Sequence, residues 1–79
     1  MTMIASIEAR IRGIIKRVAR VDGEYGSGAD LFRELGVKSV VALDLLLSLE
    51  EEFGVAIADE AFGEARSVGA LVALVEALQ

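Results

Sequence analysis

Apolar residues near the start of the chain recur with the period of an α-helix. Successive members lie one, three or four residues apart, which places them on one stripe: Ile4, Ile7, Ile11, Ile14, Ile15 and Val18. The charged residues of this segment fall mostly on the other faces. The pattern therefore predicts an amphipathic helix from about residue 3 to residue 20.

The next segment, residues 21–38, lacks this period and predicts a long connection. It contains a turn-rich run at 22–28, with three glycines and a serine. We expect Asp30 to cap a short turn and Gly36 to end it in the left-handed conformation. A loop this long in a small domain is usually functional or fixed by its own side chains. The side chains that we expect to fix it are Leu31, Phe32 and Leu35.

The rest of the chain predicts three further helices. The first runs from Ser39 to about Phe53 and stops at Gly54. After a short extended stretch, Asp59 is expected to cap a brief helix that reaches Phe62 and Gly63. Ser67 then caps a last helix, in which one face is shared by Val68, Leu71, Leu74, Val75 and Leu78. The prediction is an all-α four-helix bundle with three longer helices and one short helix.

The helix that begins at Ser39 carries two apolar stripes. One arc of about 100° forms its core face and contains Ala42, Leu45, Leu46, Leu49 and Phe53. The second stripe lies roughly opposite and contains Val40, Leu43 and Leu47. Either the short helix or the loop covers this second stripe, or it is an exposed patch that docks partners. Acidic residues flank it, with Asp44 and Glu51 on one side and Glu50 on the other, as a partner with a basic rim would require.

Composition limits the chemistry that the chain can perform. Its 79 residues predict a single domain, 1–79, with a thin core. Hydrophobic residues make up 54% and charged residues 27%, so the chain is too apolar for intrinsic disorder. It has no cysteine and no histidine, which removes the thiol nucleophile and the commonest general base. No carboxylate pair has a visible reason to be desolvated, and the acidic loop at 22–33 lacks the ligand pattern of a calcium loop. We therefore expect a protein that is not an enzyme and binds no metal.

Charge is distributed unevenly along the chain. Residues 1–20 carry five basic side chains and one acidic one, whereas residues 21–79 carry three basic and twelve acidic ones. The net charge of −5 argues against nucleic acid and favours basic surfaces on partner proteins. The basic first segment could also be read as a membrane-surface or transit helix, but no continuous apolar segment is long enough to cross a bilayer. We expect a cytoplasmic monomer without membrane insertion.

Ser39 begins the central helix, and two interpretations of it are open. It is a simple N-cap whose hydroxyl accepts a backbone N–H, or it carries a reactive or modified group. No capping box supports the first, since Ala42 stands three residues later. A phosphate ester would be well placed there, because a helix N-terminus favours bound anions.

The residues around Ser39 resemble an acyl carrier protein. The resemblance lies in Asp30-Leu-Phe-Arg-Glu-Leu-Gly-Val-Lys-Ser39-Val-Val-Ala-Leu-Asp44, in Leu-Glu-Glu-Glu-Phe-Gly-Val-Ala-Ile at 49–57, and in Ser-Val-Gly-Ala-Leu at 67–71. It implies a four-helix bundle in which Ser39 carries 4′-phosphopantetheine, attached by a transferase that uses magnesium and coenzyme A. The thiol of this arm holds acyl groups as thioesters, and a chain without cysteine must borrow such a thiol.

The same resemblance implies a docking role for the helix after Ser39. In the family this helix contacts partners through acidic and apolar positions. Asp44, Glu50 and Glu51 match the acidic positions, and Val40, Leu43 and Leu47 match the apolar ones. The implied partners are the phosphopantetheinyl transferase and acyl-handling enzymes (synthases, acyltransferases and ligases) with basic docking surfaces. The implied setting is fatty-acid, polyketide or specialised lipid biosynthesis.

The sequence departs from the family pattern beside the serine. Lys38 stands where the family has aspartate, Val40 replaces the usual leucine, and Val41 occupies a position that is acidic in many members. This charge reversal favours a specialised carrier with its own pathway enzymes and leaves recognition by a general transferase open. The alternatives are an unmodified protein-interaction module, a carrier that has lost modification, and a peptidyl or aminoacyl carrier.

Overall fold

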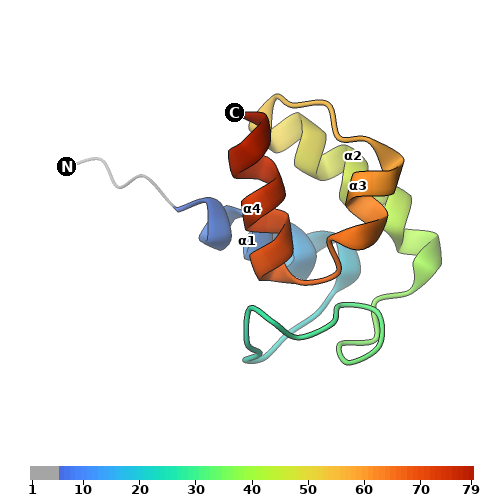
Figure 1. Ribbon diagram of the computed structural model, residues 1–79. Helices are drawn as coiled ribbons and strands as arrows, with labels where there is room; N and C mark the ends of the chain where they lie inside the picture. The colour runs from blue at the N-terminus through green and yellow to red at the C-terminus, as the bar shows by residue number, and fades with distance from the viewer. Residues whose placement is uncertain (1–5) are drawn as a thin grey trace.

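The computed structural model describes residues 6–79, which contain four α-helices and one 3₁₀ turn joined by loops (Figure 1). In chain order they are α1 (Ile7–Ala19), η1 (Ser39–Val41), α2 (Ala42–Phe53), α3 (Asp59–Glu64) and α4 (Val68–Leu78). The predicted all-α class, with three longer helices and one short helix, is confirmed. The smallest dimension of the molecule is 19 Å, which is about two helix diameters.

Helix α1 has a side-chain cap at its start and a left-handed residue at its end. The Ser6 hydroxyl accepts the backbone N–H of Ala9 at 3.0 Å, and the helix ends at Arg20, whose backbone is left-handed with φ 57°. The first residues of the predicted helix, including Ile4, lie outside the described residues. The predicted stripe is otherwise correct, because its three central members are buried: Ile11, Ile14 and Ile15.

The core lies where α1 packs against α2 and α4 (Figure 1). Its fully buried side chains come from all three longer helices and the loop, namely Ile11, Ile15, Leu31, Leu45, Leu49, Val68, Leu71 and Val75. Each such side chain contributes roughly 1.5–3 kcal/mol relative to exposure. Only one face of α2 packs in this core, so the opposite face does not contribute to it.

The helix ends match the predictions in two cases and differ in one. Gly54 ends α2 in the left-handed conformation, and the Ser67 hydroxyl caps α4 by accepting the Ala70 N–H at 3.2 Å. The prediction that Asp59 caps α3 is wrong, because Ala58 holds the cap position and Asp59 is the first helical residue. A carboxylate in the first turn favours the helix through its charge. Leu78 differs from its face-mates on α4, since it is exposed at the end of the helix.

The long loop, residues 21–38, is fixed as predicted. Leu31 is buried, and Phe32 and Leu35 pack partly buried against the core. Asp30 caps the short turn, since its Oδ1 accepts the N–H groups of residues 32 and 33, each at 2.9 Å. Gly36 ends that turn with φ 73°. The loop lies at one end of the bundle, below the helices in Figure 1.

Backbone hydrogen bonds fasten this loop to the connection between α3 and α4 and to the first turn of α4. The Leu31 N–H donates to the Arg66 carbonyl at 2.7 Å, and the Gly69 N–H donates to the Ser27 carbonyl at 2.9 Å. A Cβ at Gly69 would lie 3.3 Å from the Ser27 oxygen, so this close approach favours glycine. These two bonds join residues that are 35 and 42 positions apart in the sequence.

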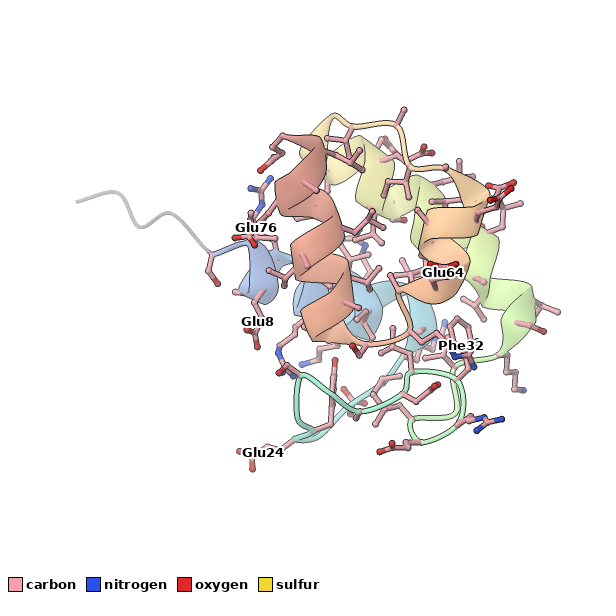
Figure 2. All side chains as sticks on the ribbon, in the orientation of Figure 1. Glu8, Glu24, Phe32, Glu64 and Glu76 are labelled. Carbon is pink, nitrogen blue, oxygen red and sulfur yellow. The ribbon has the colours of Figure 1, made fainter. Side chains whose placement is uncertain are left out.

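An ion pair reinforces the same junction. Arg66 Nε donates to Asp30 Oδ2 at 3.0 Å, and its guanidinium lies 4.8 Å from the centre of the Phe32 ring. Phe32 points from the loop toward the helices in Figure 2, whereas Glu24 projects away from the body. The Arg66 hydrogen bond, helped by the N–H of Arg33, lowers the pKa of Asp30 from 3.8 to about 2.

Candidate functional site

Ser39 is the first residue of η1, and the backbone before it is anchored in the core. Val37 is buried and donates its N–H to the Leu31 carbonyl at 2.9 Å. Lys38 then takes an extended conformation at the cap position of η1, and its carbonyl accepts the Val41 N–H at 2.9 Å. Because Val37 fixes the chain, the next two side chains, Lys38 and Ser39, are held at the surface.

The interpretation of Ser39 as a simple N-cap is wrong. The cap position belongs to Lys38, and neither η1 nor α2 has a side-chain cap. By contrast, the hydroxyls of Ser6 and Ser67 cap α1 and α4. The Ser39 side chain is exposed at the start of the helical segment that continues into α2. Its hydroxyl therefore has no capping role and is accessible.

The second apolar stripe of the central helix lies open to solvent. The relative exposures of Val40, Leu43 and Leu47 are 83%, 62% and 50%. The interpretation that α3 or the loop covers this stripe is therefore wrong. The core-facing residues of α2 are buried as predicted, apart from a partly buried Ala42. Exposed side chains of this size, grouped on one helix face beside Ser39, are typical of an interaction surface.

The acidic residues around the stripe are in two different states. Asp44 and Glu51 are exposed on one side. Glu50, on the other side, is only partly exposed, and its Oε2 accepts the Ile57 N–H at 2.8 Å. Ile57 lies in the connection from α2 to α3. Two carboxylates are thus free to meet a basic partner, whereas the third also holds this connection in place.

One residue beside this face has no role assigned from the sequence. Arg17 of α1 lines a hollow of about 200 Å³ together with Ser48, Glu51 and Glu52 of α2. The only signal in the sequence is the spacing of Arg10 and Arg17, which are seven residues apart and so share a helix face. Which helix that face meets depends on tertiary packing, so periodicity does not reveal it.

Neither a metal-binding cluster nor a membrane-spanning helix is found in the described part of the chain. Residues 6–79 contain no group of three or more histidine, cysteine, aspartate or glutamate side chains that could hold a metal ion. Within the same range, each helix is too short or too polar to cross a membrane.

Comparison with known proteins identifies the family. Residues 9–75 match the family model described as "PP-binding: Phosphopantetheine attachment site". The chain is also 35% identical over 77 residues to an acyl carrier protein of Sinorhizobium fredii, covering 96% of this chain and 99% of that one. The chain belongs to the acyl carrier protein family. The acyl carrier protein AcpP of Rhizobium meliloti matches this carrier with the same identity and coverage.

Two further relatives extend the comparison. The carrier is 37% identical over 54 residues to a mitochondrial acyl carrier protein of Dictyostelium discoideum. That match covers 68% of this chain and 45% of the Dictyostelium protein. A solved structure of a Mycobacterium tuberculosis protein assigned as an acyl carrier protein superposes with a TM-score of 0.82 at 28% identity. It covers 91% of this carrier and 97% of the mycobacterial chain, so the fold is shared almost completely.

Membership of the family gives the carrier its general function and prosthetic group. Acyl carrier proteins are carriers rather than catalysts, and they hold acyl groups as thioesters on 4′-phosphopantetheine. When bound, the arm supplies the terminal thiol that forms the thioester. The carrier's own residues fit this requirement, since the chain has no cysteine and Ser39 offers an accessible hydroxyl. The family interacts with phosphopantetheinyl transferases and acyl-handling enzymes.

Proposed function

We propose that Ser39 is the residue that carries the 4′-phosphopantetheine arm. The observation that carries this proposal is the position of its exposed hydroxyl, outside any helix cap, at the start of the helix that bears the open apolar stripe. The role of the chain's residues is to hold this hydroxyl at the surface and to leave it accessible to a transferase. Lys38 places a positive charge next to the attachment point.

The exposed face of α2 is the proposed docking surface for acyl-handling enzymes. Its apolar centre consists of Leu43 and Leu47 of α2 with Val40 of the preceding η1 turn, and its acidic positions are Asp44, Glu50 and Glu51. Synthases, acyltransferases or ligases with a basic rim fit this arrangement. The acidic surface favours an acyl carrier over a peptidyl or aminoacyl carrier, and Lys38 favours a specialised carrier within fatty-acid, polyketide or lipid biosynthesis. A cytoplasmic location, a monomeric state and the single-domain boundaries 1–79 stay predictions.

Intact mass measurement tests the attachment residue. The protein is incubated with coenzyme A, magnesium and a broad-specificity phosphopantetheinyl transferase, beside the variants Ser39→Ala and Ser27→Ala. Ser27 is a second exposed serine, in the loop, and serves as the matched control. We expect the parent and Ser27→Ala to gain one arm and Ser39→Ala to gain none. Since Ser39 caps nothing, its replacement should change the free energy of unfolding by less than about 0.5 kcal/mol.

The remaining outcomes separate the competing interpretations. A gain of mass by Ser39→Ala would disprove the assignment. If the parent gains nothing, Lys38→Asp decides between two explanations. Restored loading would show that the carrier needs a dedicated transferase, and continued failure would favour an unmodified interaction module that uses the open apolar stripe of α2.

A further inference from the structure

A basic residue of α1 borders the docking surface of α2. The hollow between the two helices is lined by Arg17 together with Ser48, Glu51 and Glu52, so one of its walls belongs to the acidic edge of the docking surface. Both Arg17 and Glu51 are exposed. An incoming partner that reaches Glu51 therefore also meets the guanidinium of Arg17.

The arginine on the same face of α1 is used differently. Arg10 Nε donates to Glu52 Oε2 at 2.8 Å, and its guanidinium lies 4.5 Å from the centre of the Phe53 ring. Arg10 thus balances the charge of Glu52 and packs on the core. Within residues 6–79, Arg17 takes part in no ion pair closer than 4 Å, although it shares a hollow with two carboxylates. Its charge is therefore available to a partner.

We propose that Arg17 is a specificity-determining residue of the docking surface, which selects partners that present an acidic side chain beside their basic ones. The proposal rests on the proposed function of α2 as the docking face. A partner surface with only basic residues is attracted by Asp44 and Glu51 but repelled by Arg17. A partner with a carboxylate opposite Arg17 replaces this repulsion with a charge-assisted hydrogen bond, for which the planar guanidinium is suited.

A simpler role for Arg17 makes a different prediction. Basic residues in the last turn of a helix stabilise it through the helix dipole, and this role applies equally to Lys16. Lys16 is also exposed, but it lines a separate hollow beside the long loop, with Asp22 and Tyr25. Lys16 is therefore a matched control. It has the same charge as Arg17 and lies in the same last turn of α1, but it does not line the hollow that contains Glu51.

The first test measures binding of a hexalysine peptide by amide chemical shifts. At about 0.1 M salt the screening length is about 10 Å, so only nearby charges act strongly. We expect the peptide to shift amides of α2, and Arg17→Gln to lower its Kd by about two- to five-fold, the range of single exposed charge pairs. Lys16→Gln, which changes the net charge equally, should alter Kd by less than about 1.5-fold. Equal effects of the two variants, or no effect of Arg17→Gln, would overturn the proposal.

The second test measures the preference for a carboxylate. Two otherwise identical lysine peptides carry either one glutamate or one glutamine, and each is titrated into the parent, Arg17→Gln and Lys16→Gln. The preference is the Kd of the glutamine peptide divided by the Kd of the glutamate peptide. We expect this ratio to be about two-fold larger in the parent than in Arg17→Gln. In Lys16→Gln the ratio should equal that of the parent. A ratio that Arg17→Gln leaves unchanged would contradict the proposal.

These measurements use the protein without its arm. A failure of Ser39 to accept phosphopantetheine therefore leaves them valid, whereas peptide shifts that avoid α2 would count against the docking surface itself and so against this proposal. The two failures are distinguishable, because mass spectrometry reports attachment and amide shifts report docking.

Discussion

The long loop and the exposed face of α2 use their large apolar side chains in opposite ways. The loop is irregular and rich in glycine, yet it buries Leu31 almost completely and fastens its backbone to the α3–α4 connection. Helix α2 is regular, yet it leaves Leu43 and Leu47 in solvent, as the preceding turn η1 does with Val40. Regular secondary structure therefore does not indicate which apolar residues hold this fold together.

The difference between the two regions has a physical reason. An irregular segment leaves backbone groups unpaired, so it becomes ordered only when buried side chains and specific hydrogen bonds fix it. A helix satisfies its own backbone groups and needs only one buried face to dock on the core. The other face of α2 is thereby free to carry residues that contribute to binding.

The largest difference is expected when the same substitution, leucine to alanine, is made in the loop and on the exposed face of α2. Leu31→Ala removes a fully buried side chain and is expected to lower the free energy of unfolding by about 2–5 kcal/mol. Leu47→Ala removes a half-exposed one, and its effect should stay below about 1 kcal/mol, while docking to acyl-handling enzymes weakens. Denaturant unfolding measures both values. Equal destabilisation by the two variants would show that the stripe on α2 is structural.

A smaller effect is expected from the arginine that joins the loop to the helices. Arg66→Ala removes the ion pair with Asp30 and the contact with the Phe32 ring, so it should cost about 1 kcal/mol. Arg33→Ala is the matched control, because that exposed arginine joins none of the observed ion pairs within residues 6–79. It should change the unfolding midpoint in denaturant only slightly. If both variants behaved alike, the side-chain contacts of Arg66 would contribute nothing to fixing the loop.

The dependence of stability on pH gives a finer test of the same contact. Because the pKa of Asp30 is about 2 in the folded protein and has its ordinary value of 3.8 in an unfolded chain, its contribution is complete above about pH 5. That contribution is lost as the pH falls from about 4 through 2. Asp30→Asn keeps an oxygen for the two backbone N–H groups but has no charge to titrate. The stability difference between parent and variant should therefore shrink over this range, whereas a constant difference would argue against the ion pair.

Much of the fold could be predicted, because it follows from local rules. The stripe of isoleucines in α1, the cap at Ser67 and the left-handed glycines at 36 and 54 each depend on residues close in sequence. The second apolar stripe of Val40, Leu43 and Leu47 could also be predicted, but periodicity alone did not show that it is exposed. Whether α3 or the loop covers α2 depends on how the segments pack, which periodicity along one helix does not specify.

The parts that could not be predicted are one helix boundary and several side-chain contacts between segments. Asp59 looked like a cap because aspartate is common there, but the backbone turns one residue earlier, at Ala58. Glu50 was expected only as an acidic residue beside the second apolar stripe, yet its carboxylate also accepts the Ile57 N–H. Arg66 offered no local pattern at all, since its partner Asp30 lies 36 residues away.

The two backbone bonds that join the loop to the α3–α4 connection and to the first turn of α4 have a consequence for local opening. Because the Leu31 N–H and the Gly69 N–H each donate across this junction, separating the two segments breaks both bonds. The two amides then belong to one cooperative opening unit, and hydrogen exchange should reveal similar opening free energies for them. The loop and the first turn of α4 would thus open and close as a single element, although about 40 residues separate them in the chain.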